Sequence, residues 1–365
     1  MSLTLLCFAA IGTQIIGFTF LLFSFRTRKE TFTHKQLPVS VIVCAHDEEE
    51  NVRELVPLLL QQDHPQFEVI IVEDRCNDET YDYLLQATKE NERLKMVRVT
   101  HKPDHINGKK FALTLGIKAA RYDWVLLTDA DCRPASHQWI AQMAKGFEHS
   151  KQIVLGFSPY FKSSGLLNAF IRFESLLTGI QFIGMAKLGR PYMGIGRNLA
   201  YRKELFLNTK GFNSHLEVTG GDDDLFVNQH ATVENTGMQM GPESLVFSKP
   251  KETWKEFMHQ KLRHLSVGKR YKLSHKIWLG VFSFSWLLTW LLVLPCLFIL
   301  PGMKVLSVLF LLRLVLLIAL MHTGAKKLGA SFEAWESPLL DFMYAFYYLV
   351  TGAKALIVKK VKWKI

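Results

Sequence analysis

The five cysteines of this 365-residue chain are scattered, and no two of them stand in a C-x-x-C spacing. Disulfide frameworks and zinc sites need closer, paired placement, so neither is expected here. We interpret the cysteines as reduced thiols in a cytoplasmic or membrane environment. They are Cys7, Cys44, Cys76, Cys132 and Cys296.

Charged residues are missing from residues 3–25, an apolar run long enough to cross a bilayer. The run has neither a basic start nor a small-residue cleavage site, so a membrane span is expected rather than a secretory signal. Arg26, Arg28 and Lys29 follow it directly. Because cytoplasmic flanks carry the positive charges, this order predicts an external N-terminus and a cytoplasmic central region.

Two further apolar runs, 277–300 and 305–320, predict two more spanning helices. Arg313 stands in the middle of the second run, where a charge is costly, so we expect it to face other helices or a polar partner. A last apolar run, 339–358, leaves two possibilities open, a span or an interfacial helix. The lysine-rich tail after it favours the interface, because a crossing would place that tail outside.

The expected organisation follows from these runs. Residues 1–26 and 277–322 form spanning helices, 37–271 form a cytoplasmic domain, and 338–365 form an interfacial or spanning helix with a basic tail. The net charge is +11, but basic residues gather beside the apolar runs. Charge in those places sets membrane topology and contacts anionic lipid, so a membrane-lipid partner is expected and a nucleic-acid partner is not.

Between the apolar runs, strand and helix patterns alternate. Continuous β-branched stretches predict buried parallel strands, and amphipathic stretches between them predict helices on both faces of the sheet. In such α/β folds, ligands bind beyond the carboxyl ends of the strands. Strands are predicted over 39–44, 67–72, 96–99 and 124–127, and helices over 49–61, 80–90 and 110–120.

Three of these strands end in carboxylates. The first is followed by residues 47–49, the second by residues 73–78, and the fourth by Asp129 and Asp131. Any one acidic exit is explained by helix capping, but three at one sheet edge would repel each other without a bound cation. Hard oxygen ligands of this kind suit Mg²⁺ or Mn²⁺, which in turn bind phosphates.

The same segments resemble family 2 glycosyltransferases of the GT-A fold over residues 37–271. Residues 39–48 resemble the opening strand and A-x-N-E turn, with Asp47 in place of Asn, and residues 72–78 resemble VDDxSxD, with Glu73 and Cys76 replacing two of its residues. Residues 108–113 resemble GKxxAL, and residues 128–131 contain the DxD motif. The resemblance implies an α/β nucleotide-diphospho-sugar transferase domain with a Rossmann-like mixed sheet and flanking transmembrane helices.

By this resemblance, the first motifs hold the donor nucleotide. Asp74 is expected to accept a hydrogen bond from the base, with uracil as the expected base. Asp129 and Asp131 are expected to hold a divalent metal, Mg²⁺ or Mn²⁺. The donor-contacting residues that the resemblance implies are Ala45, Glu48, Asp74, Lys109 and Asp129.

Later segments continue the resemblance. Gly196 and Asn198 lie in a GxNxAYR-like loop, which in the family borders the transferred sugar. Residues 220–225 resemble the GDD segment that carries the catalytic base, which makes Asp223 the expected base and Asp222 its neighbour. Packed like charges suit this role, because they raise the pKa of a base toward the range in which it takes a hydroxyl proton.

Residues 260–264, Gln-Lys-Leu-Arg-His, resemble the QxxRW motif. Gln260 and Arg263 are expected to contact the donor diphosphate, since arginine grips phosphate in a fork geometry. His264 stands where the family has Trp, at the substrate end, and its smaller ring removes a stacking platform for a sugar. That substitution and the small number of spans leave processive synthesis an open question.

An apolar stripe through residues 166–180 admits two interpretations, a buried core helix or an interfacial helix that docks the domain on lipid. The second would bring a lipid-linked acceptor to the site from the membrane.

Taken together, the apolar runs and the resemblance to family 2 glycosyltransferases imply a membrane-bound inverting hexosyl or N-acetylhexosaminyl transferase at the plasma (inner) membrane. It would move a sugar from a nucleotide-sugar donor to a lipid-linked or glycan acceptor in envelope polysaccharide or glycolipid synthesis. Two alternatives stay open: a processive polysaccharide synthase, and an inactive membrane-anchored partner of another synthase.

Overall fold

The computed structural model describes residues 3–26, 36–104, 106–148, 150–293, 295–296 and 304–357. The chain divides into two compact units. One, here called the sheet unit, consists of residues 29–161 and 189–250. The other, here called the helical unit, consists of residues 1–28, 162–188 and 251–365.

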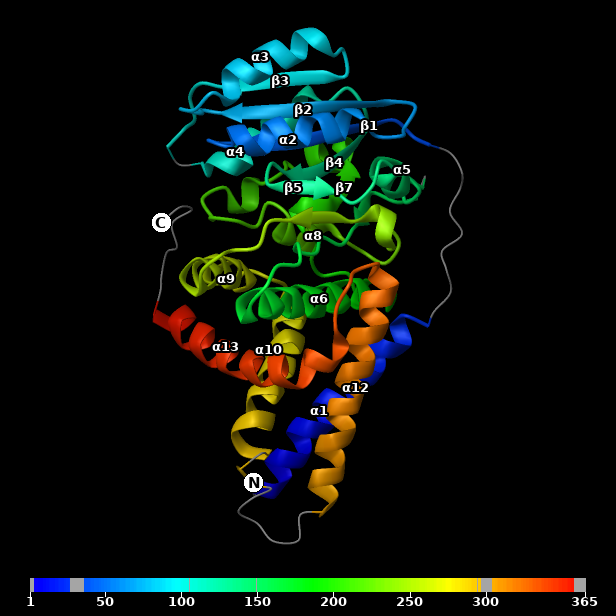
Figure 1. The fold of residues 1–365 in the computed structure, drawn as a ribbon, viewed down its shortest axis with the longest axis vertical. Coiled ribbons are helices and arrows are strands. Elements are labelled where there is room, and N and C mark those ends of the chain that lie inside the picture. The colour runs from blue at the N-terminus through cyan, green and yellow to red at the C-terminus, as the bar shows by residue number, and fades with distance from the viewer. Residues whose placement is uncertain are drawn as a thin grey trace. The chain divides into compact units, whose positions relative to one another are not determined.

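Strands belong to the sheet unit. They are β1 (Val39–Ala45), β2 (Phe67–Asp74), β3 (Leu94–Val99), β4 (Trp124–Asp129), β5 (Cys132–Pro134), β6 (Ile153–Leu155), β7 (Leu199–Arg202), β8 (Thr236–Met238) and β9 (Val246–Ser248). In the described residues, seven form one sheet in the order β3-β2-β1-β4-β7-β6-β8, and β5 pairs with β9 (Figure 1). The first four pair in parallel, as predicted, whereas β7 runs antiparallel to β4 and β6, which makes the sheet mixed.

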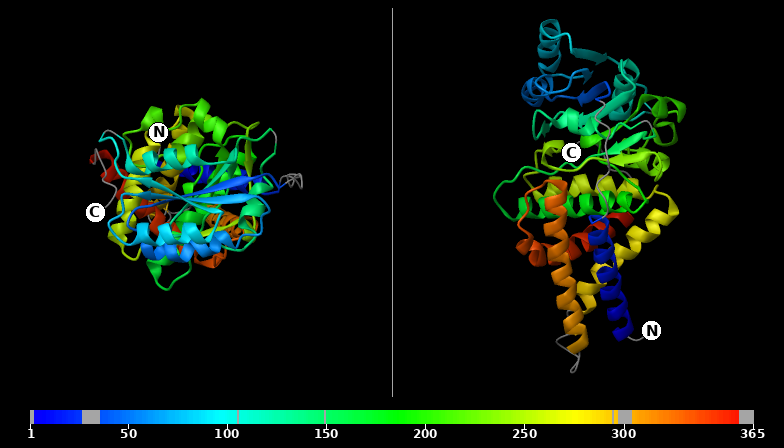
Figure 2. Two further views of the ribbon diagram at one scale, coloured as in Figure 1. Left: turned by 90° about the horizontal axis from the view of Figure 1, so that it is seen from above. Right: turned by 90° about the vertical axis from the view of Figure 1, so that its right-hand side faces the viewer.

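Helices cover both faces of the parallel strands (Figure 2). Val39, Val41 and Val43 of β1 pack with helices on one face. On the other face α4 approaches β1 and β2 closely, because a Cβ added at Gly116 would meet Ile42 at 2.8 Å. The sheet unit contains α2 (Glu49–Leu60), α3 (Thr80–Glu90), α4 (Gly108–Ala119), α5 (Trp139–Ala144), α7 (Lys203–Asn208), α8 (Asp224–His230) and the short turns η1 (Gly196–Asn198), η2 (Asn213–His215) and η3 (Pro242–Ser244).

The helical unit is built from long apolar helices. They are α1 (Leu3–Ser24), α6 (Leu166–Lys187), α9 (Trp254–Gly268), α10 (Leu273–Leu288) continuing into η4 (Thr289–Val293), α12 (Lys304–Leu328) and α13 (Ser337–Ile357), with the turn η5 (Ala334–Glu336). Within the described residues, α1, α6, α12 and the stretch Leu273–Val293 are long and apolar enough to cross a membrane. Pro301 and Gly302, which separate the two expected spans 277–300 and 305–320 in the sequence, lie outside the described residues.

The domain boundaries differ from the continuous soluble domain expected over 37–271, because residues 162–188 and 251–271 fall in the helical unit. Within that unit α6 contacts α1, α12 and α13. Most of its side chains are buried, including polar ones such as Asn168 and Glu174. An apolar helix buried on nearly every side is a core helix, which favours the first of the two interpretations of the stripe.

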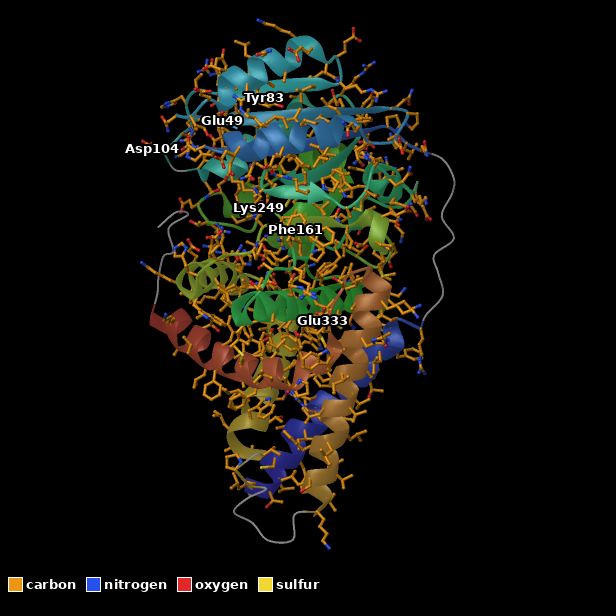
Figure 3. All side chains as sticks on the ribbon, viewed as in Figure 1. Glu49, Tyr83, Asp104, Phe161, Lys249 and Glu333 are labelled. Atoms are coloured by element: carbon orange, nitrogen blue, oxygen red, sulfur yellow. The ribbon has the colours of Figure 1, made fainter. Side chains whose placement is uncertain are left out.

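Buried charges of the helical unit are paired. Arg313, with no exposed surface, makes a fork with both carboxylate oxygens of Asp341 on α13, and its Nε donates to Gln14 of α1 at 2.6 Å. This confirms the expectation that Arg313 faces other helices and a polar partner. At the surface, Glu333, labelled in Figure 3, accepts hydrogen bonds from Lys162 and Arg172.

Candidate active site

Parallel register brings the acidic strand ends of the sheet unit together. Ala45 pairs with Glu73 across β1 and β2, and Cys44 pairs with Asp129 across β1 and β4. The half-buried Cys44 thiol lies within electrostatic range of Asp74, Asp129 and Asp222. Burial raises the pKa of this thiol, Lys109 opposes the rise and the carboxylates add to it. Carboxylates from three separate segments therefore share one sheet edge.

Lys109 connects two of these segments. Its Nζ donates to Asp129 Oδ1 at 2.7 Å and lies 3.4 Å from Asp222 Oδ2. Burial lowers the pKa of Lys109, but attraction by Asp129 and Asp222 outweighs burial and holds that pKa well above its usual value. Lys109 is thus a cation held in place between two carboxylates. Its expected contact with the donor nucleotide stays a prediction.

The segment that carries the expected base begins with a glycine turn. Gly220 and Gly221 have φ of +90° and +80°, a backbone region that favours glycine, and Asp222 and Asp223 follow at once. Asp223 is the N-cap of α8, where its Oδ1 accepts from the Asp224 N–H at 2.7 Å. Two adjacent carboxylates are thereby presented at the sheet edge beside Lys109.

The Gly196 loop contacts Asp223 directly. The Gly196 N–H donates to Asp223 Oδ2 at 2.7 Å, and a Cβ added at Gly196 would meet Asp223 Cβ at 3.3 Å. Burial first, and then repulsion by Asp222, raise the pKa of Asp223, while the Gly196 N–H and Lys109 oppose the rise. A raised pKa and a fixed orientation are the properties that a general base needs.

The DxD residues lie at the end of β4 and the turn into β5. Asp131 Oδ1 lies 3.6 Å from the Cys132 thiol, and Asp129 and Asp131 both act on the Arg197 guanidinium electrostatically. Their carboxylate oxygens are the hard ligands that Mg²⁺ and Mn²⁺ prefer. The chemistry of this donor set, at an edge with further carboxylates, therefore fits a divalent ion.

At the end of β2, Asp74 is held by its neighbour. Arg75 Nε donates to Asp74 Oδ1 at 2.7 Å, and a Cβ added at Gly108 would meet Asp74 Oδ2 at 3.3 Å. The Asp74 carbonyl oxygen lies 2.5 Å from His46 Nδ1. The Asp74 carboxylate at the end of β2 thus lies against Gly108, the first residue of α4 and the neighbour of Lys109 in the sequence.

Ala45 and Glu48, expected to contact the donor, make hydrogen bonds to other protein groups. The buried Ala45 carbonyl accepts from the Cys76 thiol at 3.5 Å, and Glu48 Oε2 accepts from Asn51 Nδ2 at 2.7 Å. Asp47, Cys76 and Asp78 offer ligand atoms within 4.8 Å of one another. Both carboxylates in that group accept backbone N–H groups, and two of these bonds connect the turn after β1 with the turn after β2: Glu49 N donates to Asp78 Oδ2 at 3.0 Å, and Asn77 N donates to Asp47 Oδ1 at 2.7 Å.

Asn198, expected beside the sugar, is fully buried. Its Nδ2 donates to the carbonyls of Phe157 and Ser244, both at 2.8 Å, and its Oδ1 accepts from Trp139 Nε1 at 3.0 Å. These bonds use both amide hydrogens and one lone pair, so the side chain anchors the loop that contains Gly196. Its expected contact with the sugar stays a prediction.

The QxxRH segment belongs to the other unit. Gln260, Arg263 and His264 lie on α9, where the intervening Lys261 forms a buried ion pair with Glu174 of α6 at 2.5 Å. The structure therefore brings together the predicted residues of the sheet unit, and the donor and substrate roles of these three residues stay predictions.

Lys110 is a site residue that sequence reasoning missed. Its fully buried Nζ donates to the carbonyls of His215 at 2.5 Å and Val218 at 2.9 Å, just before the Gly220–Gly221 turn. The only sequence signal is that a second lysine follows Lys109 in a helix start. Lys110 ties α4 to the acidic segment.

A family model supports the motif-based resemblance. The model described as glycosyl transferase family 2 matches residues 40–208, a stretch that runs from the second residue of β1 through β7. It therefore covers the strand ends, the DxD turn and the Gly196 loop.

Two curated relatives are similar over part of the chain. A probable glycosyltransferase of Bacillus subtilis, YdaM, is 27% identical over 241 residues, 63% of this chain. A poly-β-1,6-N-acetyl-D-glucosamine synthase of Staphylococcus epidermidis is 32% identical over 100 residues, 27% of this chain. The matches span 55% and 23% of the lengths of these relatives.

A solved structure shares the fold. The mannosyltransferase PcManGT of Pyrobaculum calidifontis, solved with GDP-mannose and Mn²⁺, matches with a TM-score of 0.65 and 16% identity. The match covers 98% of this chain and 99% of the other. At this identity the similarity establishes the GT-A fold and no more.

Proposed function

Since this chain carries a family 2 glycosyltransferase domain, we propose that it is a membrane-bound inverting transferase using a nucleoside-diphosphate sugar. One observation carries the proposal: a partly buried aspartate of raised pKa, Asp223, lies beside two carboxylates, Asp129 and Asp222, that share the Lys109 cation. The site thus combines a candidate base with a candidate metal and phosphate site.

Each acidic residue has a place in this reaction. Asp223 removes the proton of an acceptor hydroxyl, and the oxygen attacks the anomeric carbon from the face opposite the diphosphate. The bond between that carbon and the diphosphate oxygen breaks, and the configuration inverts. The Gly196 N–H holds the second oxygen of Asp223, which keeps the base oriented.

Asp129 and Asp131 would hold the divalent ion, and Asp74 would recognise the nucleotide base. When bound, Mg²⁺ or Mn²⁺ neutralises the negative charge that develops on the departing nucleoside diphosphate. Lys109 adds a fixed positive charge at the same edge. UDP is the nucleotide proposed from the sequence motifs, and GDP is the alternative that PcManGT suggests, since that protein was solved with GDP-mannose.

For the acceptor and the location, we propose a lipid-linked or glycan hydroxyl at the inner membrane, in envelope polysaccharide or glycolipid synthesis. The apolar helices α1 and α12 and the stretch Leu273–Val293, whose side chains are mostly not buried, support a membrane location. Gln260 and Arg263 of α9 are the proposed additional contacts of the leaving diphosphate.

The proposal is tested by screening the purified full chain in detergent against nucleotide sugars, with released nucleoside diphosphate as the readout. Asp223→Asn should lower the rate by about a thousandfold, because the asparagine amide has nearly the shape of the carboxylate but cannot accept the proton of the hydroxyl. Donor affinity, measured by calorimetry, should stay unchanged. Full activity of Asp223→Asn would remove this residue from the role of base.

A processive polysaccharide synthase is the second candidate, favoured by the similarity to the poly-N-acetylglucosamine synthase. The chemistry at the site would be the same, so product length distinguishes the two. A single added sugar supports the simple transferase, and a ladder of longer products supports the synthase.

A further inference from the structure

Arg197 stands between two residues whose positions are fixed. Gly196 before it is hydrogen-bonded to Asp223, and Asn198 after it is buried and bonded to Trp139. The Arg197 backbone is therefore held in place beside the candidate base, and its side chain can reach only a restricted region.

The Arg197 guanidinium lies next to the DxD turn. Its Cζ is 4.5 Å from the centre of the Tyr160 ring, and its Nη2 donates to the Ser158 carbonyl at 3.3 Å. Asp129 and Asp131 lie within electrostatic range. Its Nη1 is buried and has no hydrogen-bond partner among the residues that the structure describes.

Arg202, five residues later, shows what a structural arginine looks like in the same unit. Its guanidinium also lies over a ring, 5.0 Å from the centre of Trp124, and its Nε donates to the Lys151 carbonyl at 3.0 Å. Arg202 in addition forms an ion pair with Asp123. Asp123 precedes β4 and Asp129 ends it, so this pair is at the opposite end of the strand.

The two arginines differ in one respect: Arg202 has a carboxylate partner in Asp123, whereas Arg197 Nη1 has no hydrogen-bond partner among the described residues. Buried polar groups of a folded protein are nearly always hydrogen-bonded, and leaving a charged donor unsatisfied costs free energy. Arg197 keeps its positive charge at neutral pH and presents N–H donors in a planar fork that matches phosphate and carboxylate oxygens. A donor of this kind beside a candidate metal site points to an anionic ligand oxygen.

We propose that Arg197 is a donor-recognition residue whose Nη1 binds an anionic oxygen of the nucleotide sugar. The inference rests on the proposed function, since it assumes that a nucleoside diphosphate binds at the DxD turn. Tyr160 fixes the plane of the guanidinium by stacking, and the Ser158 carbonyl sets its rotation, so Nη1 is oriented before the donor arrives.

Two donor groups carry such an oxygen: the diphosphate, which every donor has, and the carboxylate of a uronic acid sugar. They are separated by binding measurements on the full chain in detergent with Mn²⁺, using UDP, GDP and UDP-glucuronate. The variants are Arg197→Gln, which removes the charge, and Arg197→Lys, which keeps the charge without the fork. Arg202→Lys is the matched control, because Arg202 has a similar environment without the DxD turn.

If the diphosphate is the ligand, Arg197→Gln should weaken whichever nucleoside diphosphate the wild type binds by about tenfold to a hundredfold. Arg197→Lys should recover part of that loss. If a uronate carboxylate is the ligand, only UDP-glucuronate affinity should fall, by a similar factor. Arg202→Lys should leave all affinities within about twofold, because its site is remote.

Affinities of both Arg197 variants equal to wild type, with unchanged thermal unfolding, would overturn the inference and leave the proposed function standing. Absence of any metal-dependent nucleotide binding by the wild type would overturn the proposed function itself, and the inference with it. A fall in unfolding temperature together with unchanged affinity would show that Arg197 is a structural residue.

Discussion

The two units bury charge in opposite ways. In the helical unit, Arg313 meets Asp341, and Lys261 meets Glu174, so each buried cation has its own carboxylate. At the sheet edge, three carboxylates from two segments, Asp129 and Asp222–Asp223, act on the single cation Lys109, and Arg197 keeps a buried nitrogen without a partner in the described residues. A balanced pair, one buried cation with one carboxylate, holds helices together. The charged groups at the sheet edge, here called the unbalanced set, include more carboxylates than cations, as expected where a metal ion and a ligand bind.

The largest effect is expected from breaking a balanced pair. Arg313→Met leaves the Asp341 carboxylate buried without its cation, which should lower the free energy of unfolding by about 3–5 kcal/mol. Thermal unfolding of the detergent-solubilised protein measures this loss. Adding Asp341→Leu should restore most of it, because the isolated charge is removed.

The exposed pair between Lys162 and Glu333 is the control for that comparison. Lys162→Met should change stability by less than about 1 kcal/mol, because water screens a surface pair. A similar loss at both pairs would show that burial does not set their importance.

Removing one member of the unbalanced set should act on binding rather than on stability. Asp131→Ala should weaken Mn²⁺-dependent nucleotide binding by about a hundredfold, measured by calorimetry with and without a chelator. Stability should stay the same or rise, because one repelling carboxylate is gone. Unchanged Mn²⁺ dependence would contradict the assignment of Asp131 as a metal ligand.

Lys110 belongs to neither the balanced pairs nor the unbalanced set, because it is a buried cation bonded to carbonyl oxygens and not to a carboxylate. Lys110→Met removes the tie to the His215–Val218 segment, so the acidic residues that follow it should be less well oriented. We expect kcat to fall by about tenfold to a hundredfold with a smaller change in KM. Lys118→Met, at an exposed position of the same helix, should leave both constants unchanged.

The smallest effect concerns pH. Burial and Asp222 raise the pKa of Asp223, and the base acts only when deprotonated, so activity should fall with decreasing pH at values above those of an ordinary aspartate. Asp222→Asn removes the repelling charge, which lowers the pKa of Asp223 and should move the acid limb of the rate profile to lower pH. Glu204→Gln, an equal charge change on α7, should leave the limb in place.

Much of the sheet unit could be predicted from sequence. The four parallel strands and three helices of residues 39–129 occur where periodicity predicted them, with ends that differ by at most two residues. Local pattern sufficed because β-branched runs and amphipathic stretches have only one favourable way to bury their apolar faces. The gathering of Asp74 and Asp129 followed from the predicted parallel strands, whereas the place of the Asp222–Asp223 segment was implied only by the family resemblance.

The helical unit was harder to predict. Residues 162–188 and 251–271 stand next to the sheet segments in the sequence, yet they pack with α1, α12 and α13. The sequence of an apolar helix does not specify which apolar surface the helix will pack against. The GKxxAL resemblance singled out Lys109, but nothing in the sequence indicated what Lys110 contacts, because adjacent residues of a helix point about 100° apart and only the packed neighbours assign each direction.

The amino-acid sequence by itself determined the alternation of strands and helices, the apolar helices and the positions of the acidic motifs, since these depend on residues close together in the chain. Tertiary structure alone decided that Asn198 anchors a loop and that Gly196 holds Asp223. It also decided that Arg197 Nη1 has no hydrogen-bond partner in the described part of the chain, while Arg202 forms an ion pair with Asp123. Those outcomes depend on contacts between residues far apart in sequence, and no local pattern encodes which polar group will meet which.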